Sequence, residues 1–457
     1  MLLYYHSTKT RLRKDSTQTF FAYLKTKMLF NIITFGCKVN QYESEVISEL
    51  MQKSGYTPCD TSDKADIVII NSCTVTSVSD GKVMKCLRRI RRINPSSVIL
   101  LTGCMPQAMP EETDKFQDAD IVIGNASRLE IVSVIGEFLA EHQRIIRIKP
   151  HNHKAFEPMT VSDFQEHTRA FVKIEDGCNR FCSYCIIPYA RGRVRSKSLD
   201  DIKAEINKLA AKGYKEVVLV GINLSAYGSD IGADLCDAVE AVCGVDGIER
   251  VRLGSLEPER MDKYVIGRLS RLEKFCPQFH LSLQSGCDAT LKRMNRHYTA
   301  DEYRRIVADL RESFDNAAIT TDIMVGFAGE TDDEFNESLN FAKEIGFAKA
   351  HIFPYSRRKG TVADKLEGQI KNEVKEIRSK LMIKATEETR RSFLKAQAGL
   401  TEKVLFETYT DGTNNGYTEN YTPVKVVSNE NYSGKILPVK LTYGGGDFCT
   451  GIVTDTL

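Results

Sequence analysis

The stretch DGCNRFCSYCIIPYARGR, residues 176–193, gathers three cysteines within eight residues. Three residues separate Cys178 from Cys182, two separate Cys182 from Cys185, and the next cysteine, Cys236, lies far downstream. Structural zinc needs four closed ligands, whereas an iron–sulfur cluster usually takes one thiolate for each iron. Three thiolates without a fourth therefore predict a cluster in which one iron keeps an open coordination position.

This stretch follows the first of six strand-like apolar runs that alternate with helical patterns. The runs are AFVKIE, EVVLVGIN, RVRLGS, FHLSLQS, ITTDIMVGF and KAHIFPYS. Six strand–helix units predict a partial α/β barrel over residues 167–397. Its long last helix, from 370 to about 396, has an apolar stripe made of Ile370, Val374, Ile377 and Leu381. Because such barrels build their sites at the carboxyl ends of the strands, we expect Cys178 at that rim.

A second set of three cysteines ends three strand-like runs nearer the amino terminus. Cys37 ends FNIITFGC, Cys73 ends ADIVIINSC, and Cys104 ends SVILLTGC. Apolar runs that alternate with helical patterns over residues 28–145 predict a parallel sheet covered on both faces. All its strands end at one edge, so the three thiols can converge on a second metal centre. A single cysteine at such a place is usually a buried packing residue, but three at equivalent ends favour the metal centre.

The remaining segments predict one further domain and two pieces without a fold of their own. Residues 1–27 are basic, lack a secretory apolar core and predict an unfolded extension, and residues 146–166 predict a linker. Short β runs punctuated by DG, NNG and GGG predict a small antiparallel β-barrel over residues 398–457. A net charge of +2 on 457 residues restricts any nucleic-acid surface to a local patch. No apolar run is long enough to span a bilayer, and we expect a cytoplasmic protein.

The motif CNRFCSYC resembles the CxxxCxxC loop of radical S-adenosylmethionine enzymes, and the order of the three domains is similar to that of the methylthiotransferases. Further stretches similar to that family are GINLSAYG (221–228), SLEP (255–258), LSLQSGCDATLKRMNRHYT (281–299), DIMVGFAGETDDEF (322–335) and HIFPYSRRKGT (351–361). The resemblance implies two [4Fe–4S] clusters, one on Cys178, Cys182 and Cys185 and one on Cys37, Cys73 and Cys104. It further implies S-adenosylmethionine as radical source and methyl donor, a tRNA substrate, a low-potential electron donor and a sulfur donor.

The stretch TFGCKVNQYESE, residues 34–45, resembles the branch of this family that acts on N6-threonylcarbamoyladenosine next to the anticodon. The branch that modifies a ribosomal protein usually has proline where this chain has Lys38, and the isopentenyladenosine branch usually reads CQMNEYDS. The resemblance therefore implies that a methylthio group replaces the hydrogen on carbon 2 of adenine. Two alternatives stay open: the same chemistry on isopentenyladenosine or a ribosomal protein, and a non-catalytic RNA-binding protein with structural zinc.

Polar residues that follow the barrel strands are candidates for cofactor contact. They are Asn223, Tyr227, Ser255, Glu257 and Gln284, and the resemblance adds Tyr184 as an aromatic wall of the adenine pocket. Candidates for RNA contact are Arg191, Arg193 and Arg195 past the cluster loop, and Lys403, Tyr417 and Tyr421 in the last domain. A basic run on the helical pattern 82–93, Arg88, Arg89, Arg91 and Arg92, is either a solvated face or a phosphate-binding one.

Overall fold

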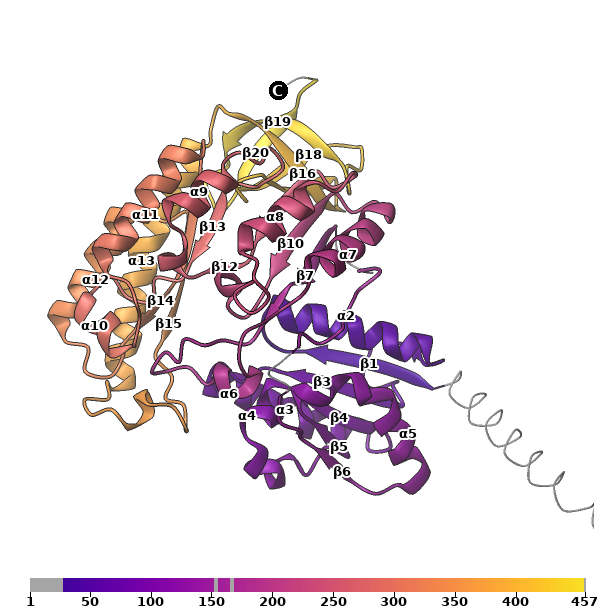
Figure 1. Cartoon of the computed structure of the whole chain (residues 1–457). Helices are drawn as coiled ribbons and strands as arrows, with labels where there is room; N and C mark the ends of the chain where they lie inside the picture. Colours follow the sequence, from indigo (N-terminus) through magenta and orange to yellow (C-terminus); the bar gives the residue numbers. More distant parts are fainter. Residues whose placement is uncertain (1–27, 152–154, 165–167, 456–457) are drawn as a thin grey trace, which may run out of the picture. The chain divides into compact units, whose positions relative to one another are not determined.

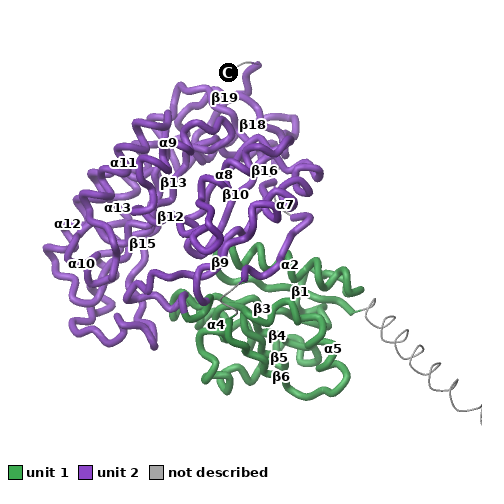
Figure 2. The backbone as a smooth tube through the Cα atoms, in the orientation of Figure 1, with its two compact units in different colours: residues 1–152, 189–191 green, residues 153–188, 192–457 purple. Residues whose placement is uncertain are grey.

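The computed structural model of this chain describes residues 28–151, 155–164 and 168–455. These residues form two compact units, and Figure 2 shows that the first contains residues up to 151 together with 189–191, while the second contains the rest. The predicted extension 1–27 lies outside the described residues. Within the described part, no helix combines the length and the apolar character that crossing a membrane requires.

The first unit is built on one six-stranded parallel sheet in the order β2-β1-β3-β4-β5-β6. Its strands are β1 Leu29–Thr34, β2 Thr57–Pro58, β3 Ile67–Ser72, β4 Val98–Gly103, β5 Ile121–Ile123 and β6 Ile145–Arg147. The predicted parallel sheet is confirmed. The short strands β2 and β6 were not predicted, and β6 extends the sheet into the segment that the sequence assigned to the linker.

Apolar residues on successive positions of β3 face opposite sides of this sheet. Ile67 and Ile69 pack in a core that contains residues of α2 (Lys38–Lys53) and α5 (Ile131–Glu141). Val68 and Ile70 pack in a second core with residues of α3 (Ser77–Ile93). The strand is therefore covered on both faces, which explains why its sequence is a continuous apolar run and does not alternate.

The second unit contains the partial α/β barrel. Its strands pair in parallel as β11-β10-β7 and as β12-β13-β14-β15, and β12 follows β11 in the chain after one residue (Figure 1). They are β7 Arg169–Lys173, β10 Glu216–Val220, β11 Arg250–Leu253, β12 Ser255–Leu256, β13 Gln278–Leu281, β14 Ala318–Val325 and β15 Lys349–Pro354. The helices between them are α7 Leu199–Ala211, α8 Leu235–Cys243, α9 Lys263–Leu269, α10 Asp288–Arg293, α11 Ala300–Ser313 and α12 Asp332–Ile345. All six predicted strand regions form strands, although RVRLGS is divided into β11 and β12.

The segment assigned to the linker is partly packed. Met159, Val161 and Phe164 are buried, the amide of Val161 donates a hydrogen bond to Glu205 at 2.7 Å, and that of Phe164 donates one to the Tyr214 hydroxyl at 2.8 Å. These three apolar residues lack periodicity because they pack as an irregular strap on the second unit, so a search for helix and strand periods could not find them.

The apolar stripe of helix α13 (Asn372–Ala396) is not its buried face. Ile377 and Leu381 of the apolar stripe are exposed, whereas Arg378 and Met382 are buried. Arg378 donates hydrogen bonds to Glu330 and Asp332, both at 2.7 Å. Because these ion pairs compensate the charge of the guanidinium, the helix can turn a charged residue inward, which a hydrophobic pattern does not reveal.

The carboxyl-terminal domain is a closed five-stranded barrel in the order β16-β17-β18-β20-β19. Its strands are β16 Thr401–Thr410, β17 Thr413–Thr418, β18 Pro423–Val427, β19 Ile436–Tyr443 and β20 Cys449–Val453. Val404, Phe406 and Val439 form its core together with Leu394 of α13. The predicted small barrel is confirmed with one difference: the pair that closes it, β18 with β20, is parallel.

A buried charge cluster attaches this small barrel to the first strands of the α/β barrel. Glu216 at the start of β10 lies 3.0 Å from Arg252 and is also paired with Arg169 and Arg250. Burial alone would raise the pKa of Glu216, but the three arginines lower it below its usual value. Arg252 donates a hydrogen bond to the backbone oxygen of Glu419 at 2.7 Å, and Arg250 donates one to that of Lys403 at 2.7 Å.

Replacing Glu216 with glutamine should destabilise the second unit by about 3–5 kcal/mol, because three arginines would lose the buried carboxylate that they share. Thermal and denaturant unfolding measure this difference. The matched control is Glu249→Gln, which removes an exposed partner of Lys215 and should change stability by less than about 0.5 kcal/mol. Equal stability of the two variants would contradict the role given to this cluster.

Candidate functional site

The first cysteine triad lies at the carboxyl ends of three neighbouring strands of the first unit. Cys37 follows β1 and precedes α2, Cys73 follows β3, and Cys104 follows β4 as the first residue of α4 (Cys104–Ala108). The pKa of the Cys73 thiol is raised to about 11 by burial and also by Cys104 and Cys37. Because β1, β3 and β4 are neighbours in the sheet, the three predicted ligands lie at one edge of it.

Glycines allow this close approach. Gly36 has a φ of +118°, and a Cβ there would lie 2.9 Å from the Cβ of Cys73. Gly103 has a φ of +99°, and a Cβ there would lie 2.4 Å from the backbone oxygen of Ser72. Because a side chain at either position would collide with the neighbouring strand, the turns that carry Cys37 and Cys104 require glycine before the cysteine.

The second triad lies in the second unit, in the loop that follows β7 and the short strand β8 (Glu175–Asp176). The pKa of the Cys178 thiol is raised to about 12 by burial and by Cys182, and that of Cys185 is also raised by burial and by both other thiols. Metal binding must therefore displace protons from these thiols.

Donors surround the sulfurs of this second triad. The side-chain amide of Asn223 lies 3.6 Å from the Cys178 sulfur, and Arg296 donates to the Cys182 sulfur at 3.4 Å. Arg296 is also paired with Glu257, which fixes its orientation. Hydrogen-bond donors and positive charge favour thiolate over thiol, so the donor set fits cluster ligands.

Neither triad is arranged around a single metal ion. Among the residues that the structure describes, no three His, Cys, Asp or Glu side chains stand close enough together to hold one ion.

Buried acceptors at the carboxyl rim of the α/β barrel have no protein partner. Oδ1 of Asn223, Oε1 of Gln284 and Oε1 of Glu175 are buried without a hydrogen bond. Gln284 also has a φ of +63°, and burial raises the pKa of the Glu175 carboxyl well above its usual value. Orphaned buried acceptors are costly unless a ligand supplies the donors. The ammonium and hydroxyl groups of S-adenosylmethionine are such donors, so this rim fits the cofactor.

The other predicted cofactor residues lie in different environments. Tyr184 packs edge-on against Phe327 with ring centroids 6.3 Å apart. Ser255 is exposed. The Tyr227 prediction needs correction, because its buried hydroxyl donates to the backbone oxygen of Lys197 at 2.7 Å and therefore supports the backbone. Two residues that sequence reasoning missed are Glu175 and Arg296, since neither stands at a diagnostic spacing from the cysteines.

The predicted RNA-binding arginines separate into buried and exposed ones. Arg191 is fully buried with Glu43, and Arg195 is buried beside Asp176, so both predictions of phosphate contact are corrected. Their ion pairs with distant carboxylates, which the sequence could not show, hold them inside. Arg193 is exposed and lies over the Phe181 ring at 4.6 Å, so it stays a prediction.

Two tyrosines of the predicted base-stacking surface in the last domain contact each other and an arginine of the α/β barrel. Tyr417 and Tyr421 stack on each other at 4.5 Å, and the Arg169 guanidinium lies 5.1 Å and 4.8 Å from their ring centroids. Both rings therefore help to attach the small barrel, and because both residues are partly exposed, their contact with RNA stays a prediction. Lys403 is exposed and stays a prediction.

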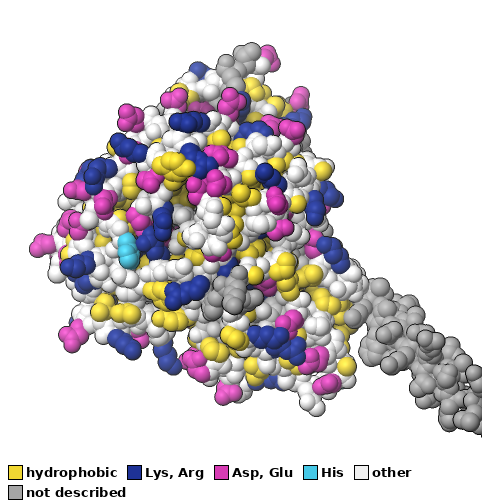
Figure 3. All heavy atoms as spheres, viewed as in Figure 1, with side chains coloured by type: hydrophobic (Ala, Val, Ile, Leu, Met, Phe, Trp, Pro, Cys, Tyr) yellow, Lys and Arg dark blue, Asp and Glu magenta, His cyan; other side chains and the backbone are white. Residues whose placement is uncertain are grey.

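Most basic side chains in view are dispersed over the surface, whereas those of α3 form a short run. Figure 3 shows Lys and Arg interspersed with Asp and Glu on the face in view, as expected for a net charge of +2. On α3, Arg88, Arg89 and Arg92 are exposed, whereas Arg91 pairs with Asp120 at 2.7 Å. Only three members of that basic run are therefore available to an anionic partner.

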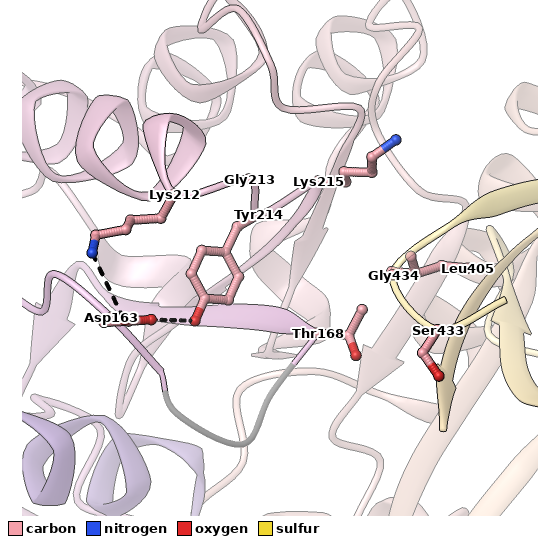
Figure 4. A pocket seen from close by; sticks show the side chains of 9 residues that line it. All are labelled: Asp163, Thr168, Lys212, Gly213, Tyr214, Lys215, Leu405, Ser433 and Gly434. Atoms are coloured by element: carbon pink, nitrogen blue, oxygen red, sulfur yellow. Dashed lines mark hydrogen bonds and ion pairs between the residues drawn. The ribbon is translucent and has the colours of Figure 1, made fainter. Parts of the chain in front are cut away.

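A cavity of about 410 Å³ in the second unit lies away from the cysteines. Figure 4 shows Tyr214 pointing to Asp163, which also faces Lys212. Thr168 and Lys215, which also line it, directly precede β7 and β10. The cavity therefore lies at the amino ends of these parallel strands, opposite the carboxyl rim, and is not part of the candidate site.

Two family models match separate parts of this chain. A family model described as "Uncharacterized protein family UPF0004" matches residues 29–124, and one described as "Radical SAM superfamily" matches residues 172–342. A solved structure of the radical S-adenosylmethionine methyltransferase TsrM from Kitasatospora setae is 13% identical, with a TM-score of 0.53 over 74% of this chain and 77% of that one, which supports the fold alone.

Three curated relatives are similar over nearly the whole chain. A protein of Bacillus subtilis (strain 168) named threonylcarbamoyladenosine tRNA methylthiotransferase MtaB is 36% identical over 92% of this chain and 94% of the relative. One of the same name from Thermotoga maritima is 38% identical over 87% and 91%. A tRNA-2-methylthio-N(6)-dimethylallyladenosine synthase of Clostridium botulinum (strain Loch Maree / Type A3) is 36% identical over 92% and 96%. Identity of this extent, together with the two cysteine triads, shows that the chain belongs to the radical S-adenosylmethionine methylthiotransferase family.

Proposed function

We propose that this protein attaches a methylthio group to carbon 2 of N6-threonylcarbamoyladenosine next to the anticodon of tRNA. The observation that carries the proposal is the pair of cysteine triads, each at the carboxyl ends of parallel strands and each one thiol short of a closed set. The names of the relatives in Bacillus subtilis and Thermotoga maritima support this substrate. Because the substrate is tRNA, the proposed compartment is the cytoplasm, with a low-potential electron donor and a sulfur donor as further partners.

In this proposal each triad holds one [4Fe–4S] cluster. When bound, the clusters and S-adenosylmethionine supply the radical that removes the hydrogen and the sulfur and methyl group that replace it. The chain itself binds, orients and excludes water. Cys178, Cys182 and Cys185 hold the cluster of the second unit, and the unpaired acceptors of Asn223 and Gln284 orient the cofactor beside it.

Substrate choice is proposed to involve Lys38. It is the first residue of α2, it is exposed, and it directly follows Cys37. The threonylcarbamoyl group carries a carboxylate, whereas the isopentenyl group is apolar, so a cation at a helix amino terminus favours the former. Relatives named for either substrate are 35–38% identical to this chain, so overall identity does not separate the two, and the local residue carries the choice.

Analysis of tRNA nucleosides tests the proposed function directly. The chain is produced in a bacterial host without its own carbon-2 methylthiolation, and the nucleosides are separated and weighed by mass spectrometry. We expect 2-methylthio-N6-threonylcarbamoyladenosine to appear and isopentenyladenosine to stay unmodified. Methylthio groups found only on isopentenyladenosine, or only on a ribosomal-protein peptide, would refute the proposed substrate.

Single cysteine variants should separate the two centres. Cys182→Ala should abolish formation of 5′-deoxyadenosine from S-adenosylmethionine, because its cluster loses a ligand. Cys73→Ala should keep that cleavage but yield no methylthio product. Cys59→Ala, which changes a cysteine of the first unit outside both triads, serves as the control and should keep both activities. Methylthio product from the Cys73 variant would contradict the proposed centre on Cys37, Cys73 and Cys104.

Lys38→Gln should lower kcat/KM for threonylcarbamoyladenosine tRNA roughly tenfold, because a charge-assisted contact to the carboxylate is lost. Kinetics on tRNA with and without the threonyl carboxylate measure this effect. Lys53→Gln, at the other end of the same helix and exposed, is the matched control and should leave the rate unchanged. An equal loss on both substrates would argue against a contact with the carboxylate.

A further inference from the structure

The edge of the first unit that carries Cys104 also buries an ion cluster. Glu43 of α2 lies between Arg128 and Arg191, and all three side chains are almost completely shielded from solvent. Oε1 of Glu43 pairs with both guanidinium groups, and Oε2 accepts a hydrogen bond from Arg191 at 3.0 Å. Glu43 therefore holds two guanidinium groups together in a buried environment, where charges are weakly screened.

The remaining donor of Arg191 points to a cysteine. Its Nε donates to the Sγ of Cys104 at 3.2 Å, while its second terminal nitrogen donates to Oδ1 of Asn40 at 3.2 Å. Asn125 approaches the same sulfur at 3.7 Å. Since the guanidinium is planar and its donors are fixed in a fork, the bonds to Glu43 and Asn40 determine where Nε points.

The backbone holds Arg191 in this position. Arg191 is the last residue of the short helix α6 (Ile187–Arg191), and residues 189–191 belong to the first unit. The backbone oxygen of Ala190 accepts a hydrogen bond from Asn125 at 3.0 Å and lies 2.9 Å from a ring nitrogen of His151. Gly192, with a φ of +76°, ends the helix. The chain thus delivers an arginine to Cys104 only six residues after Cys185.

We propose that Arg191 sets the reduction potential of the cluster held by Cys37, Cys73 and Cys104. The inference rests on the proposed function, because it takes Cys104 as a ligand of that cluster. A hydrogen bond to a ligating sulfur and a nearby positive charge both stabilise the reduced cluster, which is the more negative form. Burial strengthens this effect because the charge is weakly screened. Arg191 raises the potential, and Glu43 both orients the guanidinium and offsets part of its charge.

A redox titration of the cluster of the first unit, with the other cluster removed, tests this inference. The parent is the full chain with Cys178, Cys182 and Cys185 replaced by alanine, so that only the cluster of the first unit is present. Its midpoint potential is measured by electron paramagnetic resonance during stepwise reduction with dithionite. In this parent, Arg191→Gln should shift the equilibrium between oxidised and reduced cluster at least tenfold toward the oxidised form, which is 59 mV for one electron.

Glu43→Gln should shift the same equilibrium in the opposite direction, because it removes a negative charge near the sulfur and leaves both arginines in place. Opposite signs distinguish an electrostatic role from a structural one, which would weaken the cluster in both variants. Arg191→Lys keeps the charge without the fork and should give a smaller shift than Arg191→Gln. Arg91→Gln is the matched control, since Arg91 is an ion-paired arginine of the same unit that bonds to Asp120 and to backbone oxygens.

The possible outcomes distinguish failure of the proposed cluster from failure of the role of Arg191. A parent that binds no iron and sulfide would overturn the proposed cluster of the first unit itself. A parent with an intact cluster whose potential is the same in the Arg191→Gln and Arg91→Gln variants would overturn the role of Arg191 alone. If Arg191→Gln does not retain a cluster, Glu43→Gln and Arg191→Lys decide: shifts of opposite sign support the inference, and unchanged or equal shifts reject it.

Discussion

The position of cysteines at the carboxyl ends of parallel strands is the constraint on which the site depends. Strands β1, β3 and β4 are neighbours in one sheet, so residues that follow them meet at one edge whatever their separation in sequence. Three thiols reach that edge, and the second unit provides three more after its first barrel strand. Each set is one thiolate short of closing a cluster, and in the proposed function this leaves an iron free to bind a reacting group.

Buried arginines perform two different tasks in the two units. Around Glu216 three arginines share one carboxylate, and their other donors go to backbone oxygens and aromatic rings of the small barrel, which they attach. Around Glu43 two arginines share one carboxylate, and the remaining donor of Arg191 goes to the sulfur of Cys104. Arginines that share a buried carboxylate thus attach a domain in one place and contact a predicted ligand sulfur in the other.

The parts that could be predicted from sequence are those fixed by local pattern. Continuous apolar runs located β3, β4 and the barrel strands, and the cysteines at their ends located both triads. The destinations of polar side chains could not be predicted, because their partners lie far away in sequence: Arg191 and Glu43 are 148 residues apart. For the same reason the sequence could not show that Arg169 and Arg252 lie over the Tyr421 ring, or that α13 buries Arg378 and Met382.

The account can be tested most directly by counting iron and sulfide, with Mössbauer spectra, in the anaerobically reconstituted full chain and in two triple alanine variants. One variant lacks Cys37, Cys73 and Cys104, and the other lacks Cys178, Cys182 and Cys185. We expect about eight irons in the full chain and about four in each variant, all as [4Fe–4S] clusters. In each cluster, one iron without a cysteine ligand should be distinct from the other three. Zinc without sulfide, or a triple variant that loses no iron, would contradict it.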